Sequence, residues 1–129
     1  MLSKEDRLHR INMWHDVERR VREFFLDRDF IEVRTPILVE SPGMEPNLDP
    51  METELRLVNP QRKLRAGLIT SPEYSMKKIL GSGVDRIFTI TPVFRNVEAT
   101  GGNHLPEFTM LEWYAPGNYD DLMSETEQL

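Results

Sequence analysis

Cysteine is absent from this chain of 129 residues, and histidine occurs only three times. The absence of cysteine excludes disulfide bonds, thiolate metal ligands and a cysteine nucleophile. His9, His15 and His104 are too scattered along the sequence to indicate a zinc site. The search for chemistry therefore turns to the charged and aromatic side chains.

Long apolar runs are also absent. No stretch approaches the roughly 20 apolar residues that a membrane-spanning helix needs, and the start, MLSKEDRLHR, lacks the apolar stretch of a secretory signal. We therefore expect a cytoplasmic protein with no membrane partner. With 39% apolar and 29% charged residues, the chain has the length and composition of one soluble domain.

An excess of basic residues is lacking as well. The formal net charge of −6 argues against a free-standing nucleic-acid-binding module, because neutralising phosphates requires a basic face. The net charge does not exclude a local basic groove. The arginine-rich run DVERRVREFFLDRD is matched by acidic residues within one helical turn, so we interpret it as a solvated helix face.

The first half of the chain predicts a helix followed by strands. Ser3 and Asp6 have the spacing of a capping box, and apolar residues then recur at helical intervals from about Lys4 to Arg28. FIEVRTPIL predicts a strand that ends near Pro36. After a loop rich in proline come two strands, near ETELRLV and LRAGLIT, joined by a turn over residues 59–62.

The second half predicts a helix, two strands and a further helix. Ser71 as N-cap, Pro72 at the first helical position and Glu73 in the first turn mark a helix start, and glycine at position 81 or 83 marks its end. RIFTITPVF and the residues around 107–114 predict strands, and the chain finishes in a helical pattern. This order predicts an α+β domain with a mainly antiparallel sheet.

The strand-like run EFTMLEWY carries its charged residues among aromatic ones. Alternation places Thr109, Leu111 and Trp113 on one face, which we predict to be core, and the opposite face carries Glu112 and Tyr114 beside large apolar groups. Burying a carboxylate there is costly unless it meets a cation or strong donors, and a cationic ligand is one way to supply them. The alternative is a glutamate on a solvated sheet face.

The loop before this strand carries a second set of polar residues. Paired glycines allow the backbone to bend, and a loop that carries His104 beside Arg95 could close over phosphates. Phe108 offers a ring on which a base could stack. The alternative is that the loop is a plain hairpin connection and that Phe108 belongs to the core. Glu73 could likewise serve only to interact with the dipole of the helix that it begins.

Taken together, these segments resemble a known enzyme family. FRNVEATGGNHLPEFTMLEWY resembles motif 2 of class II aminoacyl-tRNA synthetases, and HLPEFTMLEWY resembles the lysyl branch in particular. FIEVRTPIL after its helix resembles motif 1, the dimer-interface element. LITSPEYSMKKIL resembles the segment that supplies an acid to the amino-acid pocket. Motif 1 then covers residues 17–38 and motif 2 residues 87–114.

Within that branch, the chain is similar to the lysyl-tRNA synthetase paralogues that modify elongation factor P, the GenX/PoxA type. The resemblance implies activation of lysine or β-lysine by ATP and Mg2+, followed by transfer to a lysine of elongation factor P. It also implies a homodimer formed through motif 1. A lysyl-tRNA synthetase that charges tRNA, and a non-catalytic dimerisation or regulatory module, are the alternatives.

The resemblance also implies a role for each polar residue of the site. Arg95 would be the catalytic residue that contacts the α-phosphate and the amino-acid carboxylate. Two further residues would contact the ends of ATP: Glu98 the adenine amino group and His104 the outer phosphates. The Phe108 ring would stack on the adenine. The amino acid would be bound by its α-amino group at Glu73 and by its side-chain ammonium at Glu112 and Tyr114.

The chain departs from the family pattern at several points. Asn103 and Leu105 stand where the family has a basic residue and an asparagine, and the motif 2 loop is one residue longer. Motif 3, with its second arginine and its magnesium-binding carboxylates, has no counterpart in these 129 residues. We therefore expect the N-terminal part of a catalytic domain, truncated before motif 3, with little or no ligase activity of its own.

Overall fold

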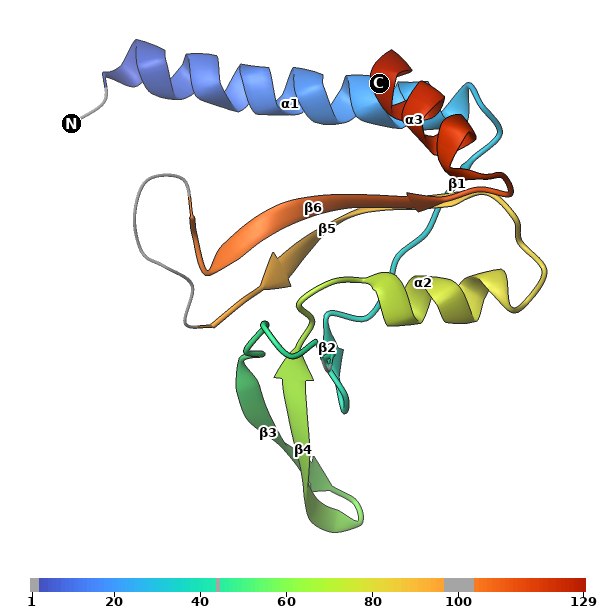
Figure 1. The fold of residues 1–129 in the computed structure, drawn as a ribbon. Coiled ribbons are helices and arrows are strands. Elements are labelled where there is room, and N and C mark those ends of the chain that lie inside the picture. Colours follow the sequence, from blue (N-terminus) through green and yellow to red (C-terminus); the bar gives the residue numbers. More distant parts are fainter. Residues whose placement is uncertain (1–2, 44, 97–103) are drawn as a thin grey trace.

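The computed structural model describes residues 3–43, 45–96 and 104–129. Within these residues a long N-terminal helix lies on one side of a strand pair, and a short helix lies on the other side (Figure 1). A two-stranded arm projects from the same region. In chain order the elements are α1 Lys4–Leu26, β1 Ile31–Glu32, β2 Leu38–Val39, β3 Glu52–Val58, β4 Gln61–Leu68, α2 Glu73–Leu80, β5 Ile87–Phe94, β6 Glu107–Tyr114 and α3 Tyr119–Gln128.

One sheet has the order β1-β5-β6, with β1 parallel to β5 and β6 antiparallel to it. The β5–β6 register runs from Ile87 opposite Tyr114 to Phe94 opposite Glu107. A second sheet has the order β2-β4-β3 and is antiparallel throughout. The predicted α+β class with mainly antiparallel strands is therefore confirmed.

Helix α1 begins at the predicted capping box. The Ser3 hydroxyl accepts a hydrogen bond from the Asp6 backbone N–H at 3.0 Å, and the Asp6 carboxylate accepts from the Ser3 backbone N–H at 3.1 Å. These bonds satisfy N–H groups that have no partner within the helix. The helix ends two residues before the predicted Arg28, because Asp29 takes a left-handed φ of 61° and the Phe30 N–H bonds back to the Phe25 carbonyl.

The arginine-rich run of α1 forms ion pairs at its surface, as predicted. Arg19 pairs with Glu23 and Arg22 pairs with Glu18, each one turn away. Arg22 also pairs with Glu32 of β1 at 3.0 Å. These exposed pairs contribute little to stability, so the run serves as a solvated face.

The hydrophobic core lies where the end of α1 meets the sheet. Phe25, Phe30 and Phe88 form a buried cluster, with Leu111 and Trp113 of β6 packed against it. The Phe25 and Phe88 rings stack at 4.8 Å between centroids. This confirms the prediction that Leu111 and Trp113 face the core.

Three details of the strands differ from prediction. Thr109, predicted to be core, is exposed, because it lies opposite Pro92 beyond the stretch covered by the aromatic cluster. FIEVRTPIL forms two short strands rather than one, since pairing with β5 ends soon after Glu32. The turn between β3 and β4 is shorter than the predicted residues 59–62, because Val58 already pairs with Gln61.

The start of α2 also differs in detail. The N-cap position is Pro72, not Ser71, although the Ser71 hydroxyl does accept a hydrogen bond from the Glu73 N–H at 3.1 Å. The helix ends at Leu80, and Gly83 has the predicted left-handed φ of 97°. Among the helices of the described ranges, none is long and apolar enough to cross a membrane.

Candidate active site

The polar face of β6 lies on the side of the sheet opposite α1. Glu112 pairs with Thr89 of β5, and directly paired residues of antiparallel strands point to the same face. Thr89 is buried, and Glu112 is half-buried. Glu112 therefore does not lie on a fully solvated sheet face, the alternative that the sequence left open.

Two neutral hydroxyl groups bind the Glu112 carboxylate. Ser71 donates to one oxygen at 2.9 Å, and Tyr114 donates to the other at 2.7 Å. In the described part of the chain, Glu112 forms no ion pair with a lysine, an arginine or a histidine. The hydrogen-bond donors to this carboxylate are thus neutral, and Lys77, which pairs with Glu73, acts on Glu112 only through electrostatic attraction.

The Tyr114 hydroxyl is held in its protonated form. Burial raises its pKa above the ordinary tyrosine value, and so do the hydrogen bond to Glu112 and the negative charges of Glu112 and Glu73. Each of these effects opposes formation of a phenolate. Tyr114 therefore acts as a hydrogen-bond donor to Glu112. Because Ser71 bonds both to Glu112 and to the Glu73 N–H, the three predicted amino-acid-binding residues lie in one region.

Ser71 links the start of α2 to strand β6. Its hydroxyl accepts from the backbone N–H of Glu73 and donates to Glu112. Glu73 itself pairs with Lys77 one turn further along the helix, and this pairing raises the pKa of Lys77. The sequence marked Ser71 only as a helix cap, since its bond to Glu112 joins residues far apart in the chain.

Arg95 and Phe108 come together at the other end of the strand pair. The Arg95 backbone N–H donates to the Pro106 carbonyl at 3.0 Å, and the guanidinium lies 5.1 Å from the centroid of the Phe108 ring. The Arg95 Nε is buried and has no hydrogen-bond partner among the described residues. A buried N–H group without an acceptor is costly, so this guanidinium is suited to receive an anion.

The remaining predicted nucleotide contacts are less well placed. His104 is exposed just before β6. Glu98 lies outside the described residues. Of the four residues predicted to contact the nucleotide, the structure therefore brings Arg95 and Phe108 together.

The two groups of residues lie at opposite ends of one strand. Phe108 and Glu112 are four residues apart, which corresponds to about 13 Å along a strand. The intervening face carries Met110 opposite Thr91. An extended ligand with an anionic or aromatic part at one end and a cationic part at the other matches this arrangement.

Comparison with known proteins identifies the family. The sequence model of the class II tRNA synthetases (D, K and N) matches residues 1–129. The chain belongs to this family. The resemblance seen in the sequence is thereby confirmed, and the α+β fold with its antiparallel strands agrees with it.

Curated relatives within this class II family cover most of the chain. The "Elongation factor P--(R)-beta-lysine ligase" of Actinobacillus succinogenes is 48% identical over 96 residues, 74% of this chain and 29% of the relative. The homolog of this ligase in Aquifex aeolicus is 43% identical over 120 residues, 92% of this chain and 40% of the relative. The ligase of Haemophilus influenzae is 45% identical over 97 residues. The chain thus spans well under half the length of these relatives.

The family match does not by itself say which residues would bind a metal ion. In the parts of the chain that the structure describes, no three histidine, cysteine, aspartate or glutamate side chains are grouped so that they could hold a metal ion. The prediction that Mg2+ is bound mainly by other residues stays a prediction.

The protonated state of Tyr114 generates a testable expectation. The chain has three tyrosines, and we expect one of them to ionise at a clearly higher pH than the others in an absorbance titration of the folded chain. Tyr114→Phe should remove that late transition, whereas Tyr119→Phe, at an exposed position, should not. Late ionisation that persists in Tyr114→Phe would contradict this geometry.

The raised pKa of Tyr114 also makes the free energy of unfolding depend on pH. The native state holds the Tyr114 proton more tightly than the unfolded chain, whose tyrosines ionise near pH 10. The contribution of Tyr114 to the free energy of unfolding is therefore fully present below about pH 10 and is lost as the pH rises further. Urea unfolding of the native chain and of Tyr114→Phe across this range should show a smaller alkaline loss in the variant.

Proposed function

We propose that residues 1–129 are the N-terminal part of the catalytic domain of a class II ligase that activates lysine or β-lysine with ATP. The activated amino acid is then transferred to a lysine of elongation factor P. The single observation that carries the amino-acid assignment is the half-buried Glu112 carboxylate, whose partners are two neutral hydroxyls. The names of the relatives support elongation factor P as the acceptor.

Glu112 is the proposed partner of the substrate side-chain ammonium. A cation that approaches a partly desolvated carboxylate gains more electrostatic energy than it would in water. The hydroxyls of Ser71 and Tyr114 fix the two carboxylate oxygens in place, so little reorganisation accompanies binding. Glu73 at the start of α2 is the proposed acceptor for the substrate α-amino group, in exchange for its pairing with Lys77.

Arg95 is the proposed catalytic residue at the nucleotide end. In the first step the amino-acid carboxylate attacks the α-phosphorus of ATP, a new phosphorus–oxygen bond forms, and pyrophosphate leaves. The guanidinium of Arg95 stabilises the negative charge that develops on the α-phosphate, and its buried Nε lacks any other acceptor among the described residues. No covalent bond to the protein is needed, so positioning and electrostatics supply the rate.

The other nucleotide contacts follow from the same assignment. Phe108 stacks on the adenine, Glu98 accepts from the adenine amino group, and His104 contacts the outer phosphates. In the second step the ε-amino group of the acceptor lysine attacks the carbonyl of the adenylate, AMP leaves, and an amide bond forms. Magnesium would add charge neutralisation at the phosphates, with ligands from residues outside those described.

The exposed part of α1 is the proposed dimer interface. An apolar stripe runs along α1, and its C-terminal part, with Val21 and Phe25, packs in the core. Its N-terminal part has four side chains that are 48 to 63% exposed, those of Leu8, Ile11, Trp14 and Val17. Such a stripe on a helix favours burial against another surface. A second copy of the chain, related by twofold symmetry, would cover it.

Binding measurements on the chain test the amino-acid site. We expect Glu112→Gln to weaken lysine binding by on the order of 2 kcal/mol, roughly 30-fold, because a buried charged pair is lost. ATP binding should change little. Titration calorimetry with lysine, (R)-β-lysine and ATP provides the comparison, and Glu107→Gln, at an exposed position on the same strand, is the matched control. Equal losses for both ligands would contradict the assignment.

Arg95→Ala provides the complementary measurement in the same experiment. It should weaken the binding of ATP more than that of lysine. If neither ligand binds less tightly to Arg95→Ala, the surface is a non-catalytic module that only keeps the shape of a synthetase.

The acceptor is tested with an enzyme that contains this segment together with the additional length of the relatives. Radiolabelled lysine or (R)-β-lysine should appear on elongation factor P in the presence of ATP, and not on tRNA. A variant of elongation factor P in which the acceptor lysine is replaced by arginine is the control. Charging of tRNA without labelling of elongation factor P would instead identify a lysyl-tRNA synthetase.

Sedimentation velocity over a range of concentrations tests the dimer. We expect Ile11→Glu to shift the chain from dimer to monomer, because a charge would enter the apolar interface. His9→Glu adds the same charge to another exposed position of the same helix, nearly opposite Ile11, and should leave the dimer intact. A native chain that is monomeric at every concentration would refute the proposed interface.

A further inference from the structure

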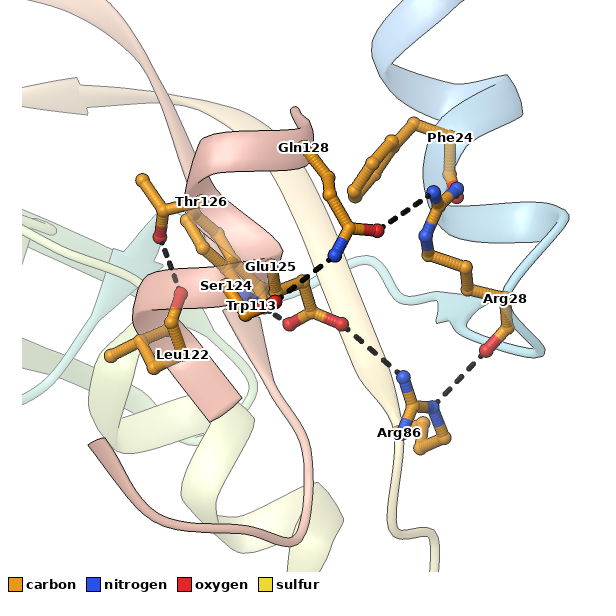
Figure 2. Close-up of polar contacts among 9 residues, drawn as sticks. All are labelled: Phe24, Arg28, Arg86, Trp113, Leu122, Ser124, Glu125, Thr126 and Gln128. Atoms are coloured by element: carbon orange, nitrogen blue, oxygen red, sulfur yellow. Dashed lines mark hydrogen bonds and ion pairs between the residues drawn. The ribbon is translucent and has the colours of Figure 1, made fainter. Parts of the chain in front are cut away.

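A polar cluster joins α3 to strand β6 (Figure 2). The Trp113 indole N–H donates to one oxygen of the Glu125 carboxylate at 2.8 Å. Arg86 donates to the other oxygen at 3.3 Å. Glu125 thus has a donor on each carboxylate oxygen, and its side chain is only 16% exposed.

The cluster continues to the end of α1. Arg86 also donates from Nε to the Arg28 carbonyl at 3.1 Å, and its guanidinium lies 4.2 Å from the centroid of the Phe30 ring. Arg28 in turn contacts Gln128 of α3 at 3.4 Å. Glu125 therefore binds side chains that are themselves fixed to the core (Figure 2).

Apolar packing contributes little to the attachment of α3. No residue of this helix is buried, and Leu122 and Met123 are 51 and 58% exposed. A cavity of about 660 Å³ between α3 and the end of β6 is lined by Arg86, Trp113 and Glu125 among others. The bond from Trp113 to Glu125 is the side-chain hydrogen bond that joins α3 to β6 among the described residues.

Trp113 connects this cluster to the candidate site through the backbone of β6. It lies between Glu112 and Tyr114 in β6, so its indole and their side chains project from opposite faces of one strand. Tyr114 is the last residue of β6. The end of a strand frays more readily than its middle, and a fixed indole restricts rotation of the strand about its own axis.

We propose that Glu125 is a positioning residue that, by holding the indole of Trp113, sets the angle at which Glu112 and Tyr114 face the amino-acid site. The assignment of that face to lysine rests on the proposed function. The geometry of the Glu112–Tyr114 hydrogen bond is independent of that proposed function. It can be followed without substrate, through the ionisation of Tyr114.

Ionisation of Tyr114 is this readout. Glu112 from its own strand and Glu73 from α2 both disfavour the phenolate. We expect Glu125→Ala to move the late tyrosine transition toward the ordinary tyrosine range and to weaken lysine binding roughly tenfold, as for one lost hydrogen bond to a charged group. ATP binding should be unchanged, because Arg95 and Phe108 lie at the far end of β6.

Matched variants separate positioning from stability. Trp113→Phe removes the indole N–H and should reproduce the shift of the tyrosine transition. Glu125→Gln keeps an acceptor for the indole, so it should retain the late transition and also serves as the test if Glu125→Ala does not fold. Glu127→Ala, at an exposed position of the same helix, should change neither property.

Three outcomes are decisive. A late transition that stays unchanged in both Glu125→Ala and Trp113→Phe, even where urea unfolding shows lower stability, would overturn the proposal and leave Glu125 with a structural role alone. Loss of the late transition in Glu125→Gln would also overturn it, since the indole would then not be the link. A shifted transition in a chain whose native form binds no lysine would uphold the positioning role and refute the ligand.

Discussion

The packing of Phe25 against the β5–β6 strand pair is the contact on which the other features depend. Phe25 is completely buried and lies within 5.4 Å, between ring centroids, of Phe24, Phe30, Phe88 and Trp113. Because this cluster commits one face of the sheet to α1, strand alternation places the intervening residues on the other face. The polar residues of β6 therefore occupy the candidate site as a consequence of how the core is packed.

That division explains why a partly buried carboxylate is tolerated in the middle of a strand. The aromatic cluster stabilises the fold by burying apolar surface on one face of the sheet, and Glu112 lies on the opposite face. Ser71 and Tyr114 reduce the cost of desolvation without neutralising the charge. A lysine or arginine at either position would neutralise the carboxylate within the protein and would leave less attraction for a cationic ligand.

Local sequence signals predicted the parts of the fold that depend on neighbouring residues. The capping box at Ser3 and the core-facing Leu111 follow from spacing alone, and the family resemblance assigned Arg95 and Phe108 to the same ligand, ATP. Thr109 was predicted wrongly because alternation does not reveal how far along the strand the aromatic cluster covers it. The bond from Ser71 to Glu112 joins residues 41 apart in the chain, and that from Trp113 to Glu125 spans 12. Neither bond has a local signature, so neither could be predicted.

The two ends of β6 carry different contacts in addition to the pairing of this strand with β5, which runs over its whole length. At the Phe108 end the additional contacts are backbone hydrogen bonds, from the Arg95 N–H to the Pro106 carbonyl and from the Asn96 N–H to the Asp49 carbonyl. At the Tyr114 end the additional contact is the side-chain hydrogen bond from Trp113 to Glu125. Backbone hydrogen bonds depend little on side-chain identity, whereas the Trp113–Glu125 bond depends on it directly. Under the proposed assignment of the two ends, substitutions at Glu125 would therefore change the amino-acid end while the geometry at the nucleotide end is retained.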